Sequence, residues 1–203
     1  MWGDCVSPTT VETLTAVSQS NLLNPVFFQF LEAIDREQAQ VIQLQGCSCG
    51  GPLHQGHFQR KPRWGGAHVA GTVDTTRFSF CCGDCRRRSM PASVRFLGRR
   101  VYWGATVVLA TALCAGLSLR RGIQLSEQFD VPILTLLRWR QWWLNDFAAS
   151  PLWLALRGRF LPPVIASDLP GELLRRVLPP DERGAMAAVL QLLAPLSTLT
   201  EGR

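Results

Sequence analysis

Four cysteines in two close pairs are the residues of this chain best suited to bind a metal ion. Cys47 and Cys49 are separated by one residue, and Cys82 and Cys85 are separated by two. Each such pair can hold one side of a tetrahedral zinc, with sulfur about 2.3 Å from the ion. Glycines that permit tight turns accompany both pairs: Gly50, Gly51 and Gly83. The sequence therefore predicts Zn²⁺ bound by Cys47, Cys49, Cys82 and Cys85.

Neighbouring residues leave this ligand set open. Cys81 could take the place of Cys82, and His54 or His57 could replace one thiolate. Four protein ligands leave no coordination position for water, so we expect the zinc to be structural. Two other interpretations are reduced, buried cysteines without metal, and a catalytic zinc held by a histidine, two thiolates and water. No well-placed glutamate base accompanies the histidines, which disfavours deaminase-type chemistry.

Cysteine usage also bears on the compartment. The chain has seven cysteines, an odd number, and its N-terminal residues show no basic segment followed by an apolar one. We therefore expect a reducing cytoplasm, with a nucleoid-associated protein whose cysteines bind metal and do not form disulfides.

Basic residues concentrate around the cysteine pairs. The net charge is +6, yet residues 47–100 carry nine Arg and one Lys against two acids, and residues 1–46 are net −4. Arginine binds phosphate through a bidentate fork, and a basic stripe gives salt-sensitive affinity for nucleic acid. Two alternatives are a GC-rich coding genome as the cause of the preference for arginine, and a basic stripe that is only a solvated face. The expected DNA contacts here are Arg60, Lys61, Arg63, Arg86, Arg87, Arg88, Arg99 and Arg100, with Arg95 in the same stripe.

The segment from Leu125 to Arg140 has the rhythm of a helix-turn-helix. A short helix should end near Phe129, with Asp130 in the left-handed turn, Val131 between the helices and a second helix starting at Pro132. The second helix would turn Leu136 and Trp139 inward. Its outward side chains would enter the major groove, with Thr135, Arg138 and Gln141 as the expected DNA contacts. An ordinary helical hairpin whose tryptophans only fill a core is the alternative.

One uncharged segment is long enough to cross a bilayer. Val101 to Leu119 contains 19 residues without a charge, between Arg99-Arg100 and Arg120-Arg121. Its many Gly, Ala, Ser and Thr residues make it only moderately apolar, so we expect a buried helix in a small helical domain rather than a membrane span.

The complete pattern predicts an α+β, mostly helical protein. We expect an N-terminal helical segment (1–40), a small β zinc ribbon (41–97), a helix-turn-helix domain (98–150) and a C-terminal helical segment (151–203). Helices are expected at about 25–39, 101–118, 123–129, 133–147, 170–177 and 181–194, a strand at 41–44, hairpin strands within 50–80 and an extended segment at 89–97.

This layout resembles the N-terminal region of insertion-sequence transposases of the zinc-ribbon type. The matching pieces are Cys47-Ser48-Cys49-Gly50, Cys82-Gly83-Asp84-Cys85 with the following three arginines, the uncharged helix and the helix-turn-helix. The resemblance covers roughly residues 41–147. That family continues into an RNase H-like domain with an acidic metal-binding triad. Only 56 residues follow Phe147 here, and their acids cluster near proline-flanked helices.

These observations predict a DNA-binding protein that is not an enzyme. The resemblance implies an accessory or regulatory role in a mobile genetic element, with DNA, a transposase or recombinase, and a second copy of the chain as expected partners. Two alternatives are a compact transposase or nuclease, and a zinc-ribbon module that docks a recombinase.

Overall fold

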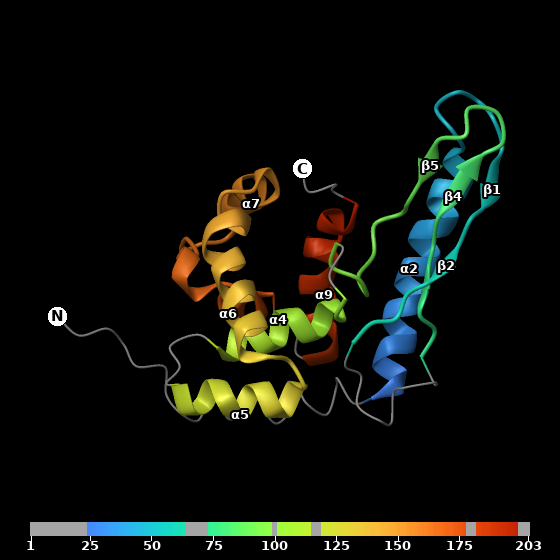
Figure 1. Cartoon of the computed structure of the whole chain (residues 1–203). Helices are drawn as coiled ribbons and strands as arrows, with labels where there is room; N and C mark the ends of the chain where they lie inside the picture. Colours follow the sequence, from blue (N-terminus) through green and yellow to red (C-terminus); the bar gives the residue numbers. More distant parts are fainter. Residues whose placement is uncertain (1–23, 64–72, 99–100, 115–118, 178–181, 199–203) are drawn as a thin grey trace. The chain divides into compact units, whose positions relative to one another are not determined.

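The computed structural model describes residues 24–63, 73–98, 101–114, 119–177 and 182–198. The chain divides into two compact units. We call Pro25–Ala105 together with Ala187–Arg203 the ribbon unit, and Thr106–Met186 together with Met1–Asn24 the helical unit. The expected α+β, mostly helical fold is confirmed: small antiparallel sheets precede a series of helices (Figure 1).

The ribbon unit begins with a long helix, α2 (Pro25–Gln45). Helix α2 starts at the expected proline but runs through residues 41–44, so the strand predicted there is wrong. The reason is tertiary packing: Ile42 continues the buried face of α2 and packs on Ala39, Phe78 and Phe80. The helix ends where Gly46, at φ +72°, donates its N–H to the Ile42 carbonyl.

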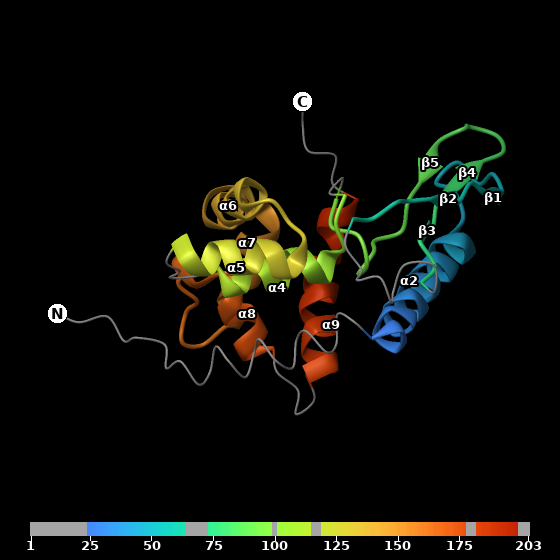
Figure 2. The same cartoon turned by 60° about the horizontal axis from the view of Figure 1, so that its bottom comes forward.

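Two small antiparallel sheets lie alongside α2 (Figures 1 and 2). One sheet has the order β1–β4–β5, and pairs Leu53 with Cys82 and Cys81 with Arg88. The other pairs Phe58 with Arg77, as the predicted hairpin requires. The strands are β1 (Leu53–Gln55), β2 (Phe58–Gln59), β3 (Thr76–Arg77), β4 (Phe80–Cys82) and β5 (Arg88–Ser89).

A buried ion pair fixes the segment that follows β5 to α2. Asp35 and Arg95 are each 1% exposed, and Arg95 Nε donates to Asp35 Oδ2 at 2.8 Å. The other Asp35 oxygen accepts the Val94 N–H at 2.7 Å, and the Arg95 terminal nitrogens donate to the carbonyls of Asp74 and Thr76. Arg95 therefore lies in the core. The prediction that it belongs to the exposed basic stripe is wrong.

The helical unit is built from short helices around aromatic side chains. Trp143, Phe129 and Phe147 are at most 1% exposed, and the rings of Trp143 and Phe147 lie 4.6 Å apart. Helix α6 continues directly into a π-helical turn, as the predicted helix over 133–147 requires. The helical unit contains α5 (Leu119–Phe129), α6 (Ile133–Trp142), η1 (Trp143–Phe147), α7 (Pro151–Leu156), η2 (Arg157–Arg159), η3 (Ala166–Asp168) and α8 (Gly171–Arg176).

Helices α4 (Gly104–Leu113) and α9 (Glu182–Leu193) contribute residues to both units, and η4 (Ala194–Ser197) follows α9. Residues 105–110 of α4 are all buried, which agrees with a core helix. Within the described ranges, every helix is too short or too polar to cross a bilayer. Helices α8 and α9 match the predictions for 170–177 and 181–194 within a few residues.

Candidate metal centre

The four predicted ligands lie around one point at the end of the ribbon. The Sγ atoms of Cys47, Cys49, Cys82 and Cys85 are all within 4.8 Å of one another. Cys49 Sγ lies 3.4 Å from Cys47 Sγ and 3.5 Å from Cys82 Sγ, and Cys47 Sγ lies 3.5 Å from Cys85 Sγ. Thiolates bound tetrahedrally at about 2.3 Å from zinc are roughly 3.8 Å apart, so the cluster fits this ion.

Strand alternation decides between the two adjacent cysteines of β4. Successive side chains of a strand point to opposite faces, so Cys81 and Cys82 cannot both face the cluster. Cys82 is buried and belongs to the cluster, whereas the thiol of Cys81 faces the carbonyls of Cys82 and Arg86 at 3.7 and 3.6 Å. Of these two cysteines, Cys82 is therefore the candidate ligand.

The two histidines lie outside the cluster. His57 Nδ1 lies 3.2 Å from the Ser79 backbone nitrogen and 2.9 Å from its carbonyl oxygen, and its ring packs edge-on against Phe78 and Phe80. His54 is exposed on β1, opposite Cys81. His57 thus has a structural role, and neither histidine belongs to the group that could hold a metal.

Each cysteine pair is held by a turn with one left-handed residue directly after its second cysteine. Gly50, at φ +83°, donates its N–H to the Cys47 carbonyl, and Arg86, at φ 59°, donates its N–H to the Cys82 carbonyl. We had expected Gly83 to take the left-handed position in the second turn. The structure gives that conformation to Arg86, which carries a Cβ and is strained there.

Gly51 is required by close packing and not by its backbone angles. A Cβ at this position would lie 2.8 Å from the Cys82 sulfur and 2.5 Å from Asp84 Oδ2. The sequence indicated a turn here from the Gly-Gly doublet, but the contact with a ligand sulfur has no sequence signal. We call the two cysteine-bearing turns the first and second knuckle. Only a residue without a side chain at position 51 brings the two knuckles this close together.

The thiols influence one another's protonation. Hydrogen bonds with the Cys49 backbone, then with the Cys49 and Cys85 side chains, hold the pKa of Cys47 below its usual value. The Arg87 backbone lowers the pKa of Cys85, but hydrogen bonds with Cys49, Cys47 and Cys82 outweigh it and raise the pKa to about 12. Four clustered thiols therefore do not ionise together by themselves. A divalent cation supplies the charge that makes four thiolates favourable.

The second knuckle fixes the backbone of the arginine run. Cys82 donates its N–H to the Arg87 carbonyl at 3.0 Å, and Arg88 pairs with Cys81 across the β4–β5 ladder. The side chains of Arg86, Arg87 and Arg88 are all exposed. A metal ion that orders this turn would therefore also order three neighbouring positive charges.

The remaining predicted contacts of the ribbon unit differ in exposure. Lys61 and Arg63 are exposed. Arg60 is partly buried: it donates to the Gly98 carbonyl at 2.9 Å, its guanidinium lies 5.1 Å from the centre of the Phe96 ring, and burial lowers its pKa. Arg99 and Arg100 lie outside the described residues.

The expected turn between α5 and α6 has the predicted backbone. Asp130 adopts φ 48°, Val131 is 1% exposed, and α6 begins directly after Pro132. Leu136 and Trp139 are buried, as predicted. Arg138 and Gln141 are exposed and Thr135 is partly exposed, and all three belong to α6.

Comparisons with protein-family models, curated proteins and solved structures find no match for this chain. The resemblance to zinc-ribbon transposases therefore stays a prediction. What stands on the geometry is a four-cysteine cluster beside small antiparallel strands, followed by helices, with room and ligands for a metal ion such as zinc.

Proposed function

We propose that this chain is a DNA-binding protein with a structural zinc ion. The ion would be held by Cys47, Cys49, Cys82 and Cys85, and its only chemistry would be to fix the two knuckles. The observation that carries the proposal is the arginine run: three exposed arginines share a hydrogen-bonded turn with the last two ligands. The exposed cations Lys61 and Arg63 add to the positive charge of this unit.

The pair of helices α5 and α6 would supply sequence recognition. A short turn with one left-handed residue (Asp130) and one buried apolar residue (Val131) is the usual connection of a helix-turn-helix. The second helix of that motif enters the major groove. Arg138 could donate hydrogen bonds from both terminal nitrogens to a guanine edge, and Gln141 could form hydrogen bonds with an adenine. Arg86, Arg87 and Arg88 would contact phosphates, which gives affinity without sequence preference.

The biological setting rests on the resemblance alone. A zinc ribbon followed by a helix-turn-helix suits an accessory or regulatory factor of a mobile genetic element. Such a factor would act at the nucleoid and bind element ends or a promoter. A transposase or recombinase encoded beside it would be its natural partner.

Two variants separate the proposed roles, one with Arg86 and Arg88 replaced together and one with Arg138 replaced. Wild-type zinc-bound protein is used to select duplexes from a random-sequence DNA library, and affinities are then measured over a range of salt concentrations. Replacing Arg86 and Arg88 with Ala should weaken binding to all sequences and reduce the magnitude of the salt slope by roughly 2, about one per lost phosphate contact. Replacing Arg138 with Ala should instead cost about 1–3 kcal/mol on the selected sequence only.

Arg36→Ala is the matched control, because Arg36 is an exposed arginine of the ribbon unit that pairs with Glu32 on α2. Its affinity for DNA should equal that of the wild type. Absence of any duplex binding at about 0.1 M salt would contradict the proposal.

A second function is favoured by one observation on α6. Leu134 and Leu137 are 64% and 57% exposed on the helix that would enter the groove. Apolar side chains read few bases, but they suit a protein partner. If Leu134→Ser abolishes binding of a neighbouring recombinase and leaves DNA affinity unchanged, α6 is a docking helix and not a reading helix.

A further inference from the structure

Helix α2 has a second face that the described residues of the ribbon unit leave exposed. Its buried face includes Phe27, Phe28, Leu31, Asp35 and Ala39. The opposite side carries six exposed residues spaced alternately four and three positions apart: Val26, Phe30, Ala33, Glu37, Gln40 and Leu44. We call these six residues the outer stripe. The spacing is that of the a and d positions of a heptad repeat, which line the seam between paired helices.

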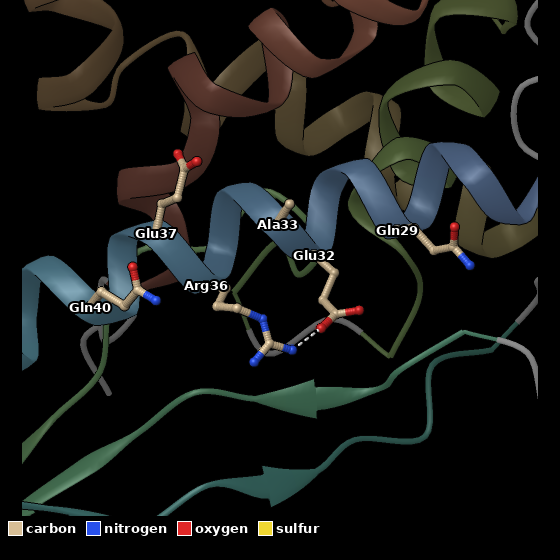
Figure 3. Close-up of a pocket in the computed structure, with 6 residues that line it drawn as sticks. All are labelled: Gln29, Glu32, Ala33, Arg36, Glu37 and Gln40. Carbon is tan, nitrogen blue, oxygen red and sulfur yellow. Dashed lines mark hydrogen bonds and ion pairs between the residues drawn. The ribbon is translucent and has the colours of Figure 1, made fainter.

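The apolar members of the outer stripe are unusually exposed. Leu44 is 88% exposed, Val26 is 56% and Phe30 is 48%, with Val41 beside them at 52%. They occupy the two ends of the stripe, and Ala33, Glu37 and Gln40 form its middle. Figure 3 shows the middle of α2, where Ala33 and Glu37 project on the opposite edge of the helix to the Glu32–Arg36 ion pair. Exposed apolar side chains at both ends of one helix face mark a surface for another helix.

The polar residues of the outer stripe decide which pairing of two copies is favourable. A parallel pair would place each Glu37 against Glu37 of the second copy, and two like charges in a seam repel. An antiparallel pair centred near residue 35 brings Val26 against Leu44, Phe30 against Gln40 and Ala33 against Glu37. Glu37 then faces a small side chain, with the exposed Arg36 of the second copy one helical turn from Ala33.

We propose that the outer stripe of α2 pairs with the same stripe of a second copy in antiparallel orientation. The self-complementarity of charge and size selects this occupant: Val26 meets Leu44, Phe30 packs on the aliphatic part of Gln40, and each Glu37 meets Ala33 and the neighbouring Arg36. Nineteen residues of helix span about 27 Å, and half of the seam positions are small or polar. The dimer is therefore reversible and concentration-dependent, as small interfaces are. It stands whether or not the chain binds DNA.

Sedimentation equilibrium of the full zinc-bound chain tests the surface. Phe30→Glu and Leu44→Glu should each raise the dimer dissociation constant at least tenfold. Leu161→Glu is the control, because Leu161 is 87% exposed in the helical unit and receives the same change. All three sites are exposed, so circular dichroism should match the wild type. A wild-type chain that stays monomeric at millimolar concentration overturns the proposal, and so does a dimer that Phe30→Glu and Leu44→Glu leave unchanged.

Two substitutions at one exposed position test the orientation. In the antiparallel pair, Ala33→Lys faces Glu37 of the second copy and should tighten the dimer severalfold, whereas Ala33→Glu should weaken it. In a parallel pair position 33 faces itself, so both changes would weaken the dimer. Equal weakening by lysine and glutamate would therefore overturn the antiparallel pairing.

Discussion

The two units of this molecule differ in the interactions that stabilise each of them internally. In the helical unit, large aromatic side chains such as Trp143, Phe147 and Trp153 pack against one another without charge. In the ribbon unit, Phe28, Phe96 and Trp103 also pack together, but the strands add a small apolar cluster with α2 and two charged or polar groups, the Asp35–Arg95 ion pair and four clustered thiols. An apolar core tolerates substitutions that conserve its volume. A buried ion pair or a metal site loses its stabilising effect when any one member is removed.

The short strands of the ribbon unit are where a metal ion would matter most. Strands β1 to β5 are two or three residues long, too short to be stable in water without further support. Zinc bound by the four cysteines would supply that support, because its binding free energy becomes folding free energy. The helical unit has no such requirement, and the two units should respond oppositely to the changes below.

Removal of the zinc should have the largest effect. Cys82→Ser deletes the buried ligand, and three remaining thiols cannot close the site. We expect the loss of about one zinc per chain by elemental analysis and the loss of amide protection in β1, β4 and β5 by two or more orders of magnitude, with α5 to α8 unchanged. Hydrogen exchange with mass spectrometry resolves the two units.

Cys81→Ser is the control for that experiment, because its sulfur lies outside the cluster. It should retain the zinc and the protected amides. Equal protection in Cys82→Ser and the wild type would mean that the ribbon unit is stable without metal.

Truncation of an aromatic residue should invert this result. Trp143 is fully buried, and Trp143→Ala leaves a cavity that costs about 4–5 kcal/mol. The loss should fall on the helical unit, with zinc content unchanged. Leu137→Ala on the neighbouring helix removes an exposed side chain and should change the free energy of unfolding by less than about 0.5 kcal/mol. A similar cost for both variants would contradict a tightly packed aromatic core.

The buried ion pair should be the next most sensitive feature. Asp35→Asn keeps an acceptor for the Val94 N–H but leaves the charge of Arg95 without its partner, at a cost of about 3 kcal/mol. Chemical denaturation followed at Trp103, which packs against Phe28 and Phe96 of the same unit, reports it. The double variant Asp35→Leu/Arg95→Met removes both charges and should cost less than Asp35→Asn alone.

Sequence patterns predicted the local features of both units better than the contacts between distant segments. Helical spacing located α2, α8 and α9, and the short-range rules for turns correctly placed Asp130 in the left-handed region. The cysteine pairs predicted the thiol cluster, because ligand spacing is itself a local signal. Strand alternation, once the register was known, then separated Cys82 from Cys81.

The partnership between Asp35 and Arg95 had no such signal. The two residues are 60 positions apart, and an arginine within a basic stripe is ordinarily solvent-exposed. The same holds for Ile42, whose β-branched neighbourhood favours a strand until its packing on Phe78 and Phe80 is known. Features that depend on what a distant segment places nearby cannot be derived from spacing along the chain.

The partly exposed ion pairs of Glu172 in the helical unit should matter least. Glu172 accepts hydrogen bonds from Arg175 and Arg176 on α8, and their side chains are 18–34% exposed. Burial raises the pKa of Glu172, but hydrogen bonds from Arg176 and Arg175 outweigh it, so the pKa is lowered overall. Because solvent screens these charges, Glu172→Gln should cost less than about 1 kcal/mol at pH 7.

The pH dependence distinguishes this contribution from simple loss of a side chain. An unfolded glutamate has a pKa of about 4.3, and the folded value is lower, so the unfolded state binds more protons in the window between them. The contribution of Glu172 is therefore fully present above that window and is lost as the pH falls through the folded pKa. The difference in free energy of unfolding between wild type and Glu172→Gln should shrink accordingly between pH 6 and pH 3, read from urea titrations of the helical unit. A difference that stays constant over this range would show that the charge of Glu172 contributes nothing, in contrast to the buried charge of Asp35.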